Sequence, residues 1–391
     1  MPDQLREEET TPPPDPSSLT SFPTPPSAPE DLSPPCHRSH DPISNLKRSN
    51  PFQFGSRYLL PTDDPYEFNA WDHVETDATY KAHAEASYAF QRASPVSAFD
   101  KTRFNTDPAK WWNKFYTNNT SNFFKDRKWL QQEFPILSDW TKKGSGSARI
   151  LEVGAGAGNT AFPILAANEN EELLLHACDF SSKAVELIRA SPAYDPRYIQ
   201  ASVWDIAGEA LPENVEDSSV DVVLLIFIFS ALSPRQWRQA VRNVYKVLKP
   251  GGEVCFRDYG RGDLAQVRFR KGRWMEENFY VRGDGTRVYF FDEEELRDMW
   301  GGGMWTKDQD GLEEIPQKST TIPSQPAKDI ITSTQDDSSG IIPSFEIESL
   351  GVDRRLLINR QSKVKMYRCW MQGYFRKPDI SNSPKPAITA I

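Results

Sequence analysis

Three glycines at alternate positions form the first candidate for a binding site. Gly154, Gly156 and Gly158 follow a short apolar run, residues 150–153, and precede residues 159–167, which are typical of a helix. Glycine lets a ligand approach the backbone closely, and the free N–H groups at the start of a helix can bind its polar atoms. The pattern predicts a binding surface for a nucleotide-like ligand, although a tight glycine turn without a ligand would also fit the pattern.

Two aspartates stand where a nucleotide would need carboxylates. Asp179 lies 25 residues after Gly154, at the end of the next apolar run, and a carboxylate there can accept hydrogen bonds from both ribose hydroxyls. Asp205 follows the third run and could accept from an adenine amino group. The turn Lys-Pro-Gly-Gly at residues 249–252 is typical of class I methyltransferases. Either aspartate alone could be a solvated loop residue, but the set favours S-adenosylmethionine over NAD as the ligand.

Alternating strands and helices must position these residues. Apolar runs predict the strands, and the segments between them predict the helices. The strands are expected at residues 150–153, 173–178, 197–203, 220–229 and 253–257, and the helices at 159–167, 181–190 and 236–248. This alternation predicts an α/β fold with a parallel sheet and right-handed crossovers, which binds its ligands at the carboxyl ends of the strands.

Composition divides the 391-residue chain into segments. Residues 1–51 are rich in proline, serine and threonine and poor in large apolar residues, so they are expected to be a disordered tail. Residues 52–147 are rich in aromatic side chains, and we expect them to form an extension that wraps the main domain. No apolar run approaches the roughly 18 residues of a membrane span. The four cysteines form no C-x-x-C pair, which indicates reduced thiols in a cytoplasmic or nuclear protein.

Basic residues are concentrated in three blocks, although the net charge is −9. Residues 101–149 hold 10 basic and 4 acidic side chains, residues 235–287 hold 13 and 6, and residues 354–377 hold 8 and none. These blocks could form one face for a polyanion, or they could be ordinary solvated surfaces. Within residues 107–140 aromatic side chains alternate with cations. Such a mixture suits stacking on bases, or covering a sulfonium while holding phosphates, but a pair of amphipathic helices would also explain it.

Four long motifs carry a resemblance to a known family. They read WNKFY with FFKDRKWLQQEFP at residues 112–135, LEVGAGAGNTAFPIL at 151–165, FRDYGRGDLAQVRF at 256–269 and NFYVRGDGTRVYFF at 278–291. With these motifs, the chain resembles the tRNA N3-methylcytidine methyltransferases, a class I family that methylates cytidine 32 in the anticodon loop. The ending NRQSKVKMYRCWMQ, at residues 359–372, is similar to the branch that acts on threonine tRNAs and, in animals, arginine tRNAs.

The resemblance implies a fold and a cofactor. The methyltransferase domain is expected over residues 148–377, as a seven-stranded, mostly parallel sheet with helices on both faces and a final antiparallel hairpin. A disordered insertion is expected at 301–340 and a disordered tail at 378–391. The implied cofactor is S-adenosyl-L-methionine, with Trp112 and Tyr116 covering it. The expected cofactor contacts are Trp112, Tyr116, Glu152, Gly154, Gly156, Gly158, Asp179, Asp205, Ile206 and Ile226.

The residues after the fifth strand are expected to form the substrate wall. Arg257, Asp258 and Tyr259 should face the cleft, and a hairpin should turn at residues 283–285. Cations would bind anticodon-loop phosphates and aromatic rings would stack on splayed bases, although any single arginine could instead form a surface ion pair. The expected substrate contacts are Phe123, Phe124, Lys125, Arg127, Arg257, Arg268, Arg282 and Arg287.

The expected chemistry needs positioning more than a strong base. N3 of a neutral cytosine already carries a lone pair in the ring plane, so it can attack a sulfonium methyl without first losing a proton. Residues 227–232 read FIFSAL and lack the Asn/Asp-Pro-Pro-aromatic motif that suits exocyclic amines. Asp258 and Tyr259 are the candidates for contact with the cytosine. We expect a monomer that binds tRNA, with a protein partner such as an aminoacyl-tRNA synthetase left open. A methyltransferase of a protein or small molecule, and a non-catalytic RNA-binding scaffold, are the alternatives.

Overall fold

The computed structural model describes residues 57–121, 123–306 and 343–379. The predicted N-terminal tail, most of the predicted insertion and the end of the C-terminal tail lie outside the described residues. Of the predicted insertion, residues 301–306 are described, and Gly303–Thr306 form a short helix, α12. None of the helices in the described ranges is long and apolar enough to cross a membrane.

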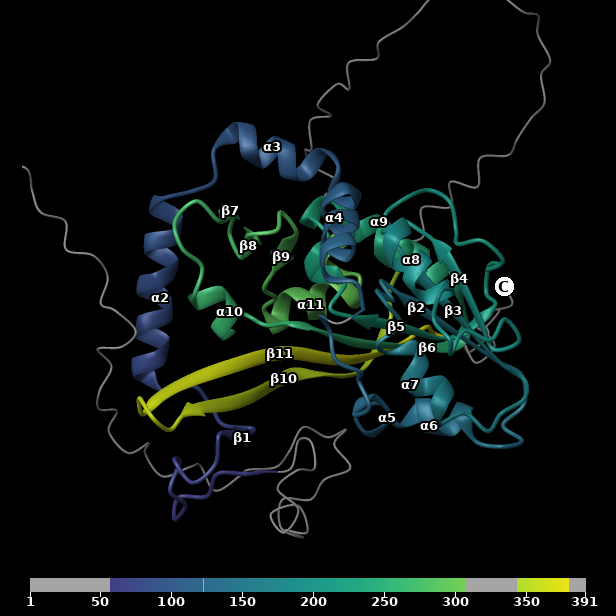
Figure 1. Cartoon of the computed structure of the whole chain (residues 1–391), viewed down its shortest axis with the longest axis horizontal. Helices are drawn as coiled ribbons and strands as arrows, with labels where there is room; N and C mark the ends of the chain where they lie inside the picture. Colours follow the sequence, from purple (N-terminus) through teal and green to yellow (C-terminus); the bar gives the residue numbers. More distant parts are fainter. Residues whose placement is uncertain (1–56, 122, 307–342, 380–391) are drawn as a thin grey trace, which may run out of the picture.

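A central eight-stranded sheet organises the molecule (Figure 1). Its order is β1-β10-β11-β6-β5-β2-β3-β4, and the five strands from β6 to β4 pair in parallel. The long strands β10 and β11 form the antiparallel hairpin that follows β6. The strands are β1 (Ala70–Asp72), β2 (Ala148–Val153), β3 (Leu173–Asp179), β4 (Ile199–Val203), β5 (Val220–Ile226), β6 (Leu248–Tyr259), β10 (Glu346–Asn359) and β11 (Val364–Arg376). The predicted α/β fold, with its mostly parallel sheet and final hairpin, is confirmed.

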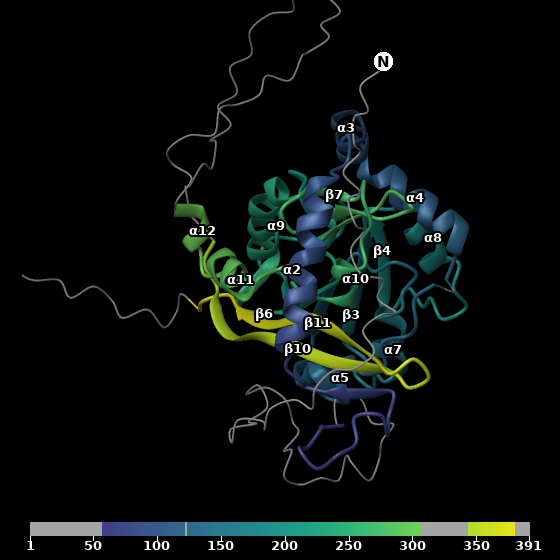
Figure 2. The same cartoon turned by 90° about the vertical axis from the view of Figure 1, so that its left-hand side faces the viewer.

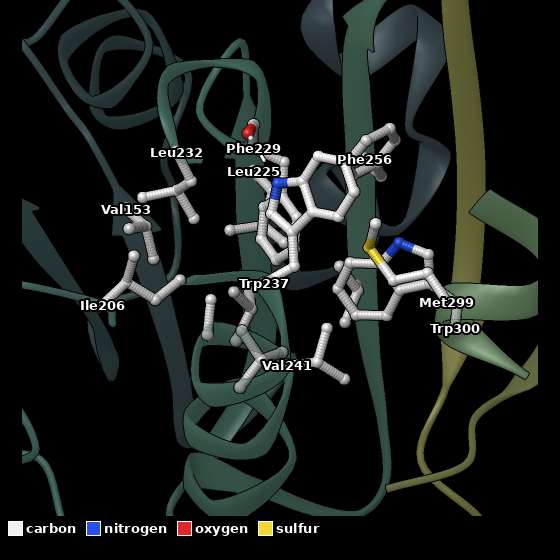
Figure 3. Close-up of a cluster of buried hydrophobic side chains, with 14 of the residues drawn as sticks. Val153, Ile206, Leu225, Phe229, Leu232, Trp237, Val241, Phe256, Met299 and Trp300 are labelled. Carbon is white, nitrogen blue, oxygen red and sulfur yellow. Dashed lines mark hydrogen bonds between the residues drawn. The ribbon is translucent and has the colours of Figure 1, made fainter. Parts of the chain in front are cut away.

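Helices cover both faces of the sheet, and the alternation of side chains along the strands fills two cores. Ile150 and Leu224 point into one core, whereas their chain neighbours Leu151 and Leu225 point into the other. Figure 3 shows the second core, where Trp237 packs among residues of β5, β6 and α11. The helices of this domain are α7 (Ala161–Ala166), α8 (Ser182–Arg189), α9 (Pro234–Val247), α10 (Leu264–Val267) and α11 (Glu293–Trp300).

The fourth predicted strand is shorter than expected. β5 ends at Ile226 rather than at residue 229, because Phe227 adopts a φ of +63° and leaves the extended conformation. Its N–H still donates to the carbonyl of Arg257, at 2.7 Å, and residues Phe229–Ala231 then form the 3-10 turn η2. The chain therefore turns sharply at the carboxyl edge of the sheet.

A small second sheet stands beside this edge. It consists of β7 (Trp274–Glu276), β8 (Phe279–Val281) and β9 (Arg287–Tyr289). β8 and β9 form the predicted hairpin, and Gly285 in its turn has a φ of +90°. A Cβ at Gly285 would lie 2.1 Å from the ring of Trp111, so only glycine lets the turn pack against the N-terminal extension.

The N-terminal extension packs against the central sheet and against α10. In its described residues it supplies the edge strand β1, which the sequence did not predict, and five helices. These are α2 (Ala78–Ala93), α3 (Ala98–Thr106), α4 (Pro108–Asn119), α5 (Leu130–Glu133) and α6 (Pro135–Thr141). Figures 1 and 2 both place α2 beside α10. The buried amide of Gln91 fixes this contact, because it donates to the carbonyls of Gln266 and Phe269 at 3.0 Å.

Candidate active site

A cavity of about 470 Å³ opens at the carboxyl ends of the parallel strands. This is the edge at which open α/β sheets bind their ligands, and the volume is in the range of ligand sites. One part of its lining lies at the ends of four strands that are successive in the sequence. This part includes Val153–Gly156 after β2, Asp179 at the end of β3, Asp205 and Ile206 after β4, and Ile226–Ile228 at the end of β5.

The glycine loop forms part of the cavity wall, and a side chain at any of its three glycines would clash with a neighbour. Gly154 and Gly156 have φ angles of +65° and +59°. A Cβ at Gly156 would lie 2.6 Å from the hydroxyl of Tyr116, and one at Gly154 would lie 1.8 Å from Ile228. Gly158 has a different place. It does not line the cavity, and a Cβ there would meet the ring of Phe162 at 2.4 Å. Because Gly158 has no side chain, the loop can pack against α7.

Asp179 connects the glycine loop to the start of α8. One of its carboxylate oxygens accepts from the N–H of Gly156 at 2.8 Å, and the other accepts from the N–H of Ser181 at 2.7 Å. Burial raises the pKa of Asp179 to about 6, although the two backbone hydrogen bonds favour the charged form. Each oxygen has a further lone pair, so the carboxylate can still accept hydrogen bonds from a ligand in the cavity.

This elevated pKa predicts a pH-dependent affinity for S-adenosylmethionine. Ribose hydroxyls are expected to donate to this carboxylate, so binding should favour the charged form of Asp179. Affinity should be constant well above pH 6 and should then fall by up to about tenfold for each pH unit below it, because the proton must be displaced. Calorimetry between pH 5 and pH 8 measures this slope. The Asp179→Asn variant, which has no proton to lose, should bind weakly with a flatter profile, and an unchanged slope in this variant would assign the titration to another group.

Glu152, one of the expected cofactor contacts, lies behind the cavity rather than in its wall. It is buried, and burial raises its pKa to about 7 while the nearby Arg127 acts in the opposite direction. Arg127 itself lines the cavity and donates to the hydroxyl of Thr160 at 2.6 Å. Its guanidinium also lies about 6 Å from the rings of Phe124 and Phe227. Arg127 was expected on the substrate side, but it stands beside the glycine loop.

Helix α4 carries the two aromatic residues expected to cover the cofactor. Trp112 and Tyr116 line the cavity with their rings stacked, 6.2 Å apart at 29°. Asn113, between them in sequence, accepts from the hydroxyl of Ser181 at 2.7 Å and from the N–H of Lys183 at 3.3 Å. This residue docks α4 onto the start of α8 and so fixes the aromatic cover. Asn113 was not predicted as a site residue, although it lies within the WNKFY motif.

Strand alternation decides which residues of β6 face the cavity. Arg257 and Tyr259 line it, whereas Asp258 does not. The oxygens of Asp258 accept from the N–H groups of Ser230 and Tyr259, at 2.9 and 2.8 Å, and burial raises its pKa to about 6. The expectation that all three residues face the cleft is therefore wrong for Asp258. Its contacts show instead that it holds the turn after β5 against the end of β6.

The predicted substrate arginines fall into three different environments. Arg257 is 1% exposed and forms an ion pair with Asp353, and Arg287 is buried and donates to Asn105 and to the carbonyl of Ala231. Arg282 is half-buried at the cavity, 5.6 Å from the ring of Tyr259. Arg268 is exposed and lies outside the cavity, beside Met366. The other expected substrate contacts, Phe123, Phe124 and Lys125, line the cavity.

Sequence reasoning missed several residues of the cavity wall. Phe227, in the FIFSAL segment, is a positive-φ residue whose ring lies 5.0 Å from that of Tyr259. Its backbone strain at the mouth of a cavity is a common mark of a functional position. Trp129, Arg368 and Trp370 also line the wall. All three lie within the family motifs at residues 112–135 and 359–372, but nothing in their spacing indicated that segments about 240 residues apart meet here.

The cavity fits S-adenosyl-L-methionine by its chemistry. Gly154 and Gly156 bring the backbone to the cavity wall, Asp179 and Asp205 are suitable acceptors for ribose and adenine donors, and Trp112 and Tyr116 offer ring faces to a sulfonium. Among the described residues no group of three or more His, Cys, Asp and Glu side chains could hold a metal ion.

Comparisons with known proteins agree with this geometry. A family model described as a methyltransferase domain matches residues 151–254. The chain is similar to the tRNA(Thr) (cytosine(32)-N(3))-methyltransferase of Saccharomyces cerevisiae, with 47% identity over 86% of this chain and 47% of that protein. It thus spans about half the length of that relative. The tRNA N(3)-methylcytidine methyltransferases of Schizosaccharomyces pombe and Drosophila melanogaster are 43% and 40% identical, over 83% and 85% of this chain and 92% and 90% of those proteins.

Proposed function

Because the chain belongs to the family of tRNA N3-methylcytidine methyltransferases, we propose that it transfers a methyl group from S-adenosyl-L-methionine to N3 of cytidine 32 in the anticodon loop of tRNA. The supporting observation in the structure is one cavity with two chemically different ends. The glycine loop, Asp179 and Asp205 form an end suited to a nucleoside cofactor. Tyr259, Phe227 and Arg282 form an end suited to a base and its phosphate.

The residues of the cavity would act mainly by orientation. When bound, S-adenosyl-L-methionine supplies an electrophilic methyl group on a sulfonium. Trp112 and Tyr116 exclude water from above and offer ring faces that stabilise a cation. Phe227 and Tyr259 hold the target base by stacking, since their rings already lie side by side at the cavity. The N3 lone pair of cytosine needs no base to expose it, so positioning two reactants supplies most of the rate enhancement.

The target base must leave its stack to enter the cavity, which favours a loop over a helix. Threonine tRNA is the proposed substrate, on the strength of the C-terminal motif at residues 359–372 and of the substrate named for the S. cerevisiae relative. A protein partner such as an aminoacyl-tRNA synthetase, a monomeric state and a cytoplasmic or nuclear location stay predictions.

Reconstitution with purified components tests the proposal. The protein, labelled S-adenosyl-L-methionine and an unmodified threonine-tRNA transcript should yield N3-methylcytidine, located at position 32 by mass spectrometry of nuclease fragments. A transcript with uridine at position 32 is the matched control and should accept no methyl group. A protein that binds the cofactor but methylates neither this transcript nor bulk tRNA from a strain lacking the modification would overturn the proposal. Equal rates on all tRNAs with cytidine 32 would remove the preference for threonine tRNA.

A further inference from the structure

Four side chains form an alternating ladder of tryptophan rings and guanidinium groups on the cavity wall. The guanidinium carbon of Arg257 lies 5.1 Å from the ring of Trp129 and 4.9 Å from that of Trp370, and that of Arg368 lies 4.8 Å from the ring of Trp370. All four residues line the same cavity as the glycine loop. We call this set, Trp129, Arg257, Trp370 and Arg368, the Trp–Arg ladder.

The pairing of β6 with β11 builds the ladder. Trp370 is the cross-strand partner of Tyr259, and Gln372 is the partner of Arg257. Since the side chains two residues apart on a strand share a face, Tyr259, Trp370 and Arg368 all project toward the cavity. The ladder therefore stands next to the proposed site of the target base.

Arg257, the inner cation of the Trp–Arg ladder, is held in place by its hydrogen-bond partners. Arg257 is 1% exposed, and it donates to Asp353 at 2.5 Å and to the side-chain oxygen of Gln372. A buried guanidinium with these partners is a fixed support for the two tryptophans rather than a mobile ligand for phosphates. The expected role of Arg257 as a direct substrate contact is replaced by this supporting role.

The outer cation is held differently, by one nitrogen only. The Nε of Arg368 donates to Asp263 at 2.8 Å, and the same carboxylate oxygen accepts from the N–H of Cys369 at 2.9 Å. Asp263 is fully buried, whereas the Arg368 side chain is 28% exposed. Among the described residues no hydrogen-bond partner is found for its two terminal nitrogens. The guanidinium plane is thus already oriented, so little side-chain entropy is lost when a ligand binds it.

We propose that Arg368 is the outer end of a base-stacking subsite, and that the next flat group in the ladder is the base of a loop nucleotide adjacent to the target cytidine. This inference rests on the proposed tRNA substrate. Guanidinium planes stack on unstacked RNA bases, and the alternation of the ladder leaves the face of Arg368 as its open end. The subsite selects a splayed loop, because a base that remains in a helix cannot present its face here.

Arg368→Gln tests the subsite, with Arg376→Gln as the matched control. Arg376 lies on the same strand, is exposed and pairs with Glu253, outside the cavity. We expect Arg368→Gln to raise the KM for an anticodon stem–loop about tenfold, with unchanged affinity for S-adenosyl-L-methionine, since stacking on one base has about this effect. Arg368→Lys keeps the charge but loses the plane, so it should resemble Arg368→Gln. Arg376→Gln should match the native protein.

An abasic series identifies the partner of Arg368. Removing the base at each loop position other than 32, one at a time, should weaken binding of the native protein at one position next to the target. The same abasic substrate should cost the Arg368→Gln protein nothing further. Equal abasic penalties in both proteins, or full rescue by Arg368→Lys, would overturn the stacking and indicate a phosphate contact. Fluorescence anisotropy measures binding independently of methylation. Loss of the subsite would therefore weaken binding in the Arg368 variants. A native protein that binds tRNA without methylating it would instead refute the proposed function.

Discussion

Replacing Asp179 by alanine is expected to reduce the affinity for S-adenosyl-L-methionine by at least about 100-fold, or about 2.8 kcal/mol. The substitution would remove the acceptor that we propose for the ribose hydroxyls. It also releases the N–H groups of Gly156 and Ser181, which the carboxylate holds at 2.8 and 2.7 Å. The glycine loop would then lose the partner that fixes its shape, and buried donors would be left unpaired. Isothermal titration calorimetry measures the loss directly.

Asp195→Ala is the control for this loss. Asp195 lies in the loop after α8 and pairs with the exposed Arg197, so its removal should leave cofactor affinity unchanged. Asp179→Asn separates the two roles of the carboxylate, because the amide keeps one acceptor and the shape but loses the charge. It should fall between the native protein and Asp179→Ala. If Asp179→Ala bound the cofactor within threefold of the native protein while remaining folded by circular dichroism, the glycine loop would not be the cofactor site.

The cofactor half of the site was predictable because its signals are local. Gly154 and Gly156 must be glycine in this backbone, and the apolar runs before them and before Asp179 each define one buried strand. The order of strands then follows from the handedness of the crossovers, and it brings the carboxyl ends of β2 and β3 together. The positions of Gly154, Gly156 and Asp179 therefore follow once the two neighbouring strands are identified.

The substrate half was predicted only in part, because its geometry depends on distant pairing. Asp258 and Tyr259 are neighbours, and which of them faces the cavity depends on a one-residue choice of strand phase that the irregular sequence FRDYG does not fix. Whether the Arg268 side chain is exposed depends on the residue at which α10 ends. β1 could not be predicted, since it has three residues and pairs with β10 about 280 residues away.

The Trp–Arg ladder also could not be predicted from the sequence, because it depends on pairing between distant segments. The sequence shows correctly how many cations residues 354–377 contain. However, the acids that pair with these cations all lie outside that block. Asp72 and Asp263, from other segments of the chain, neutralise Arg355 and Arg368 of this block. A count of charges along the sequence therefore overestimates how many cations remain for RNA, and only the folded arrangement distinguishes a supporting arginine from a binding one.

Tyr259→Ala is expected to lower kcat/KM for tRNA by at least about 100-fold, with little effect on cofactor affinity. The ring of Tyr259 lies 5.0 Å from Phe227 and 5.6 Å from Phe290, and the guanidinium of Arg282 lies 5.6 Å from it. Removing the ring would leave a gap between the cofactor end of the cavity and the Trp–Arg ladder, so the base would no longer be held in one orientation. Loss of positioning alone can account for an effect of this size.

Tyr259→Phe distinguishes the ring from its hydroxyl. If stacking carries the effect, this variant should retain methyl transfer to within about tenfold of the native protein, because the ring and its neighbours are unchanged. A loss as large as that of Tyr259→Ala would assign the effect to the hydroxyl, as a hydrogen-bonding contact with the cytosine. Single-turnover rates at saturating tRNA separate chemistry from binding in both variants. Full activity of Tyr259→Ala would exclude Tyr259 from the substrate site and leave the neighbouring Phe227 as the aromatic residue that holds the base.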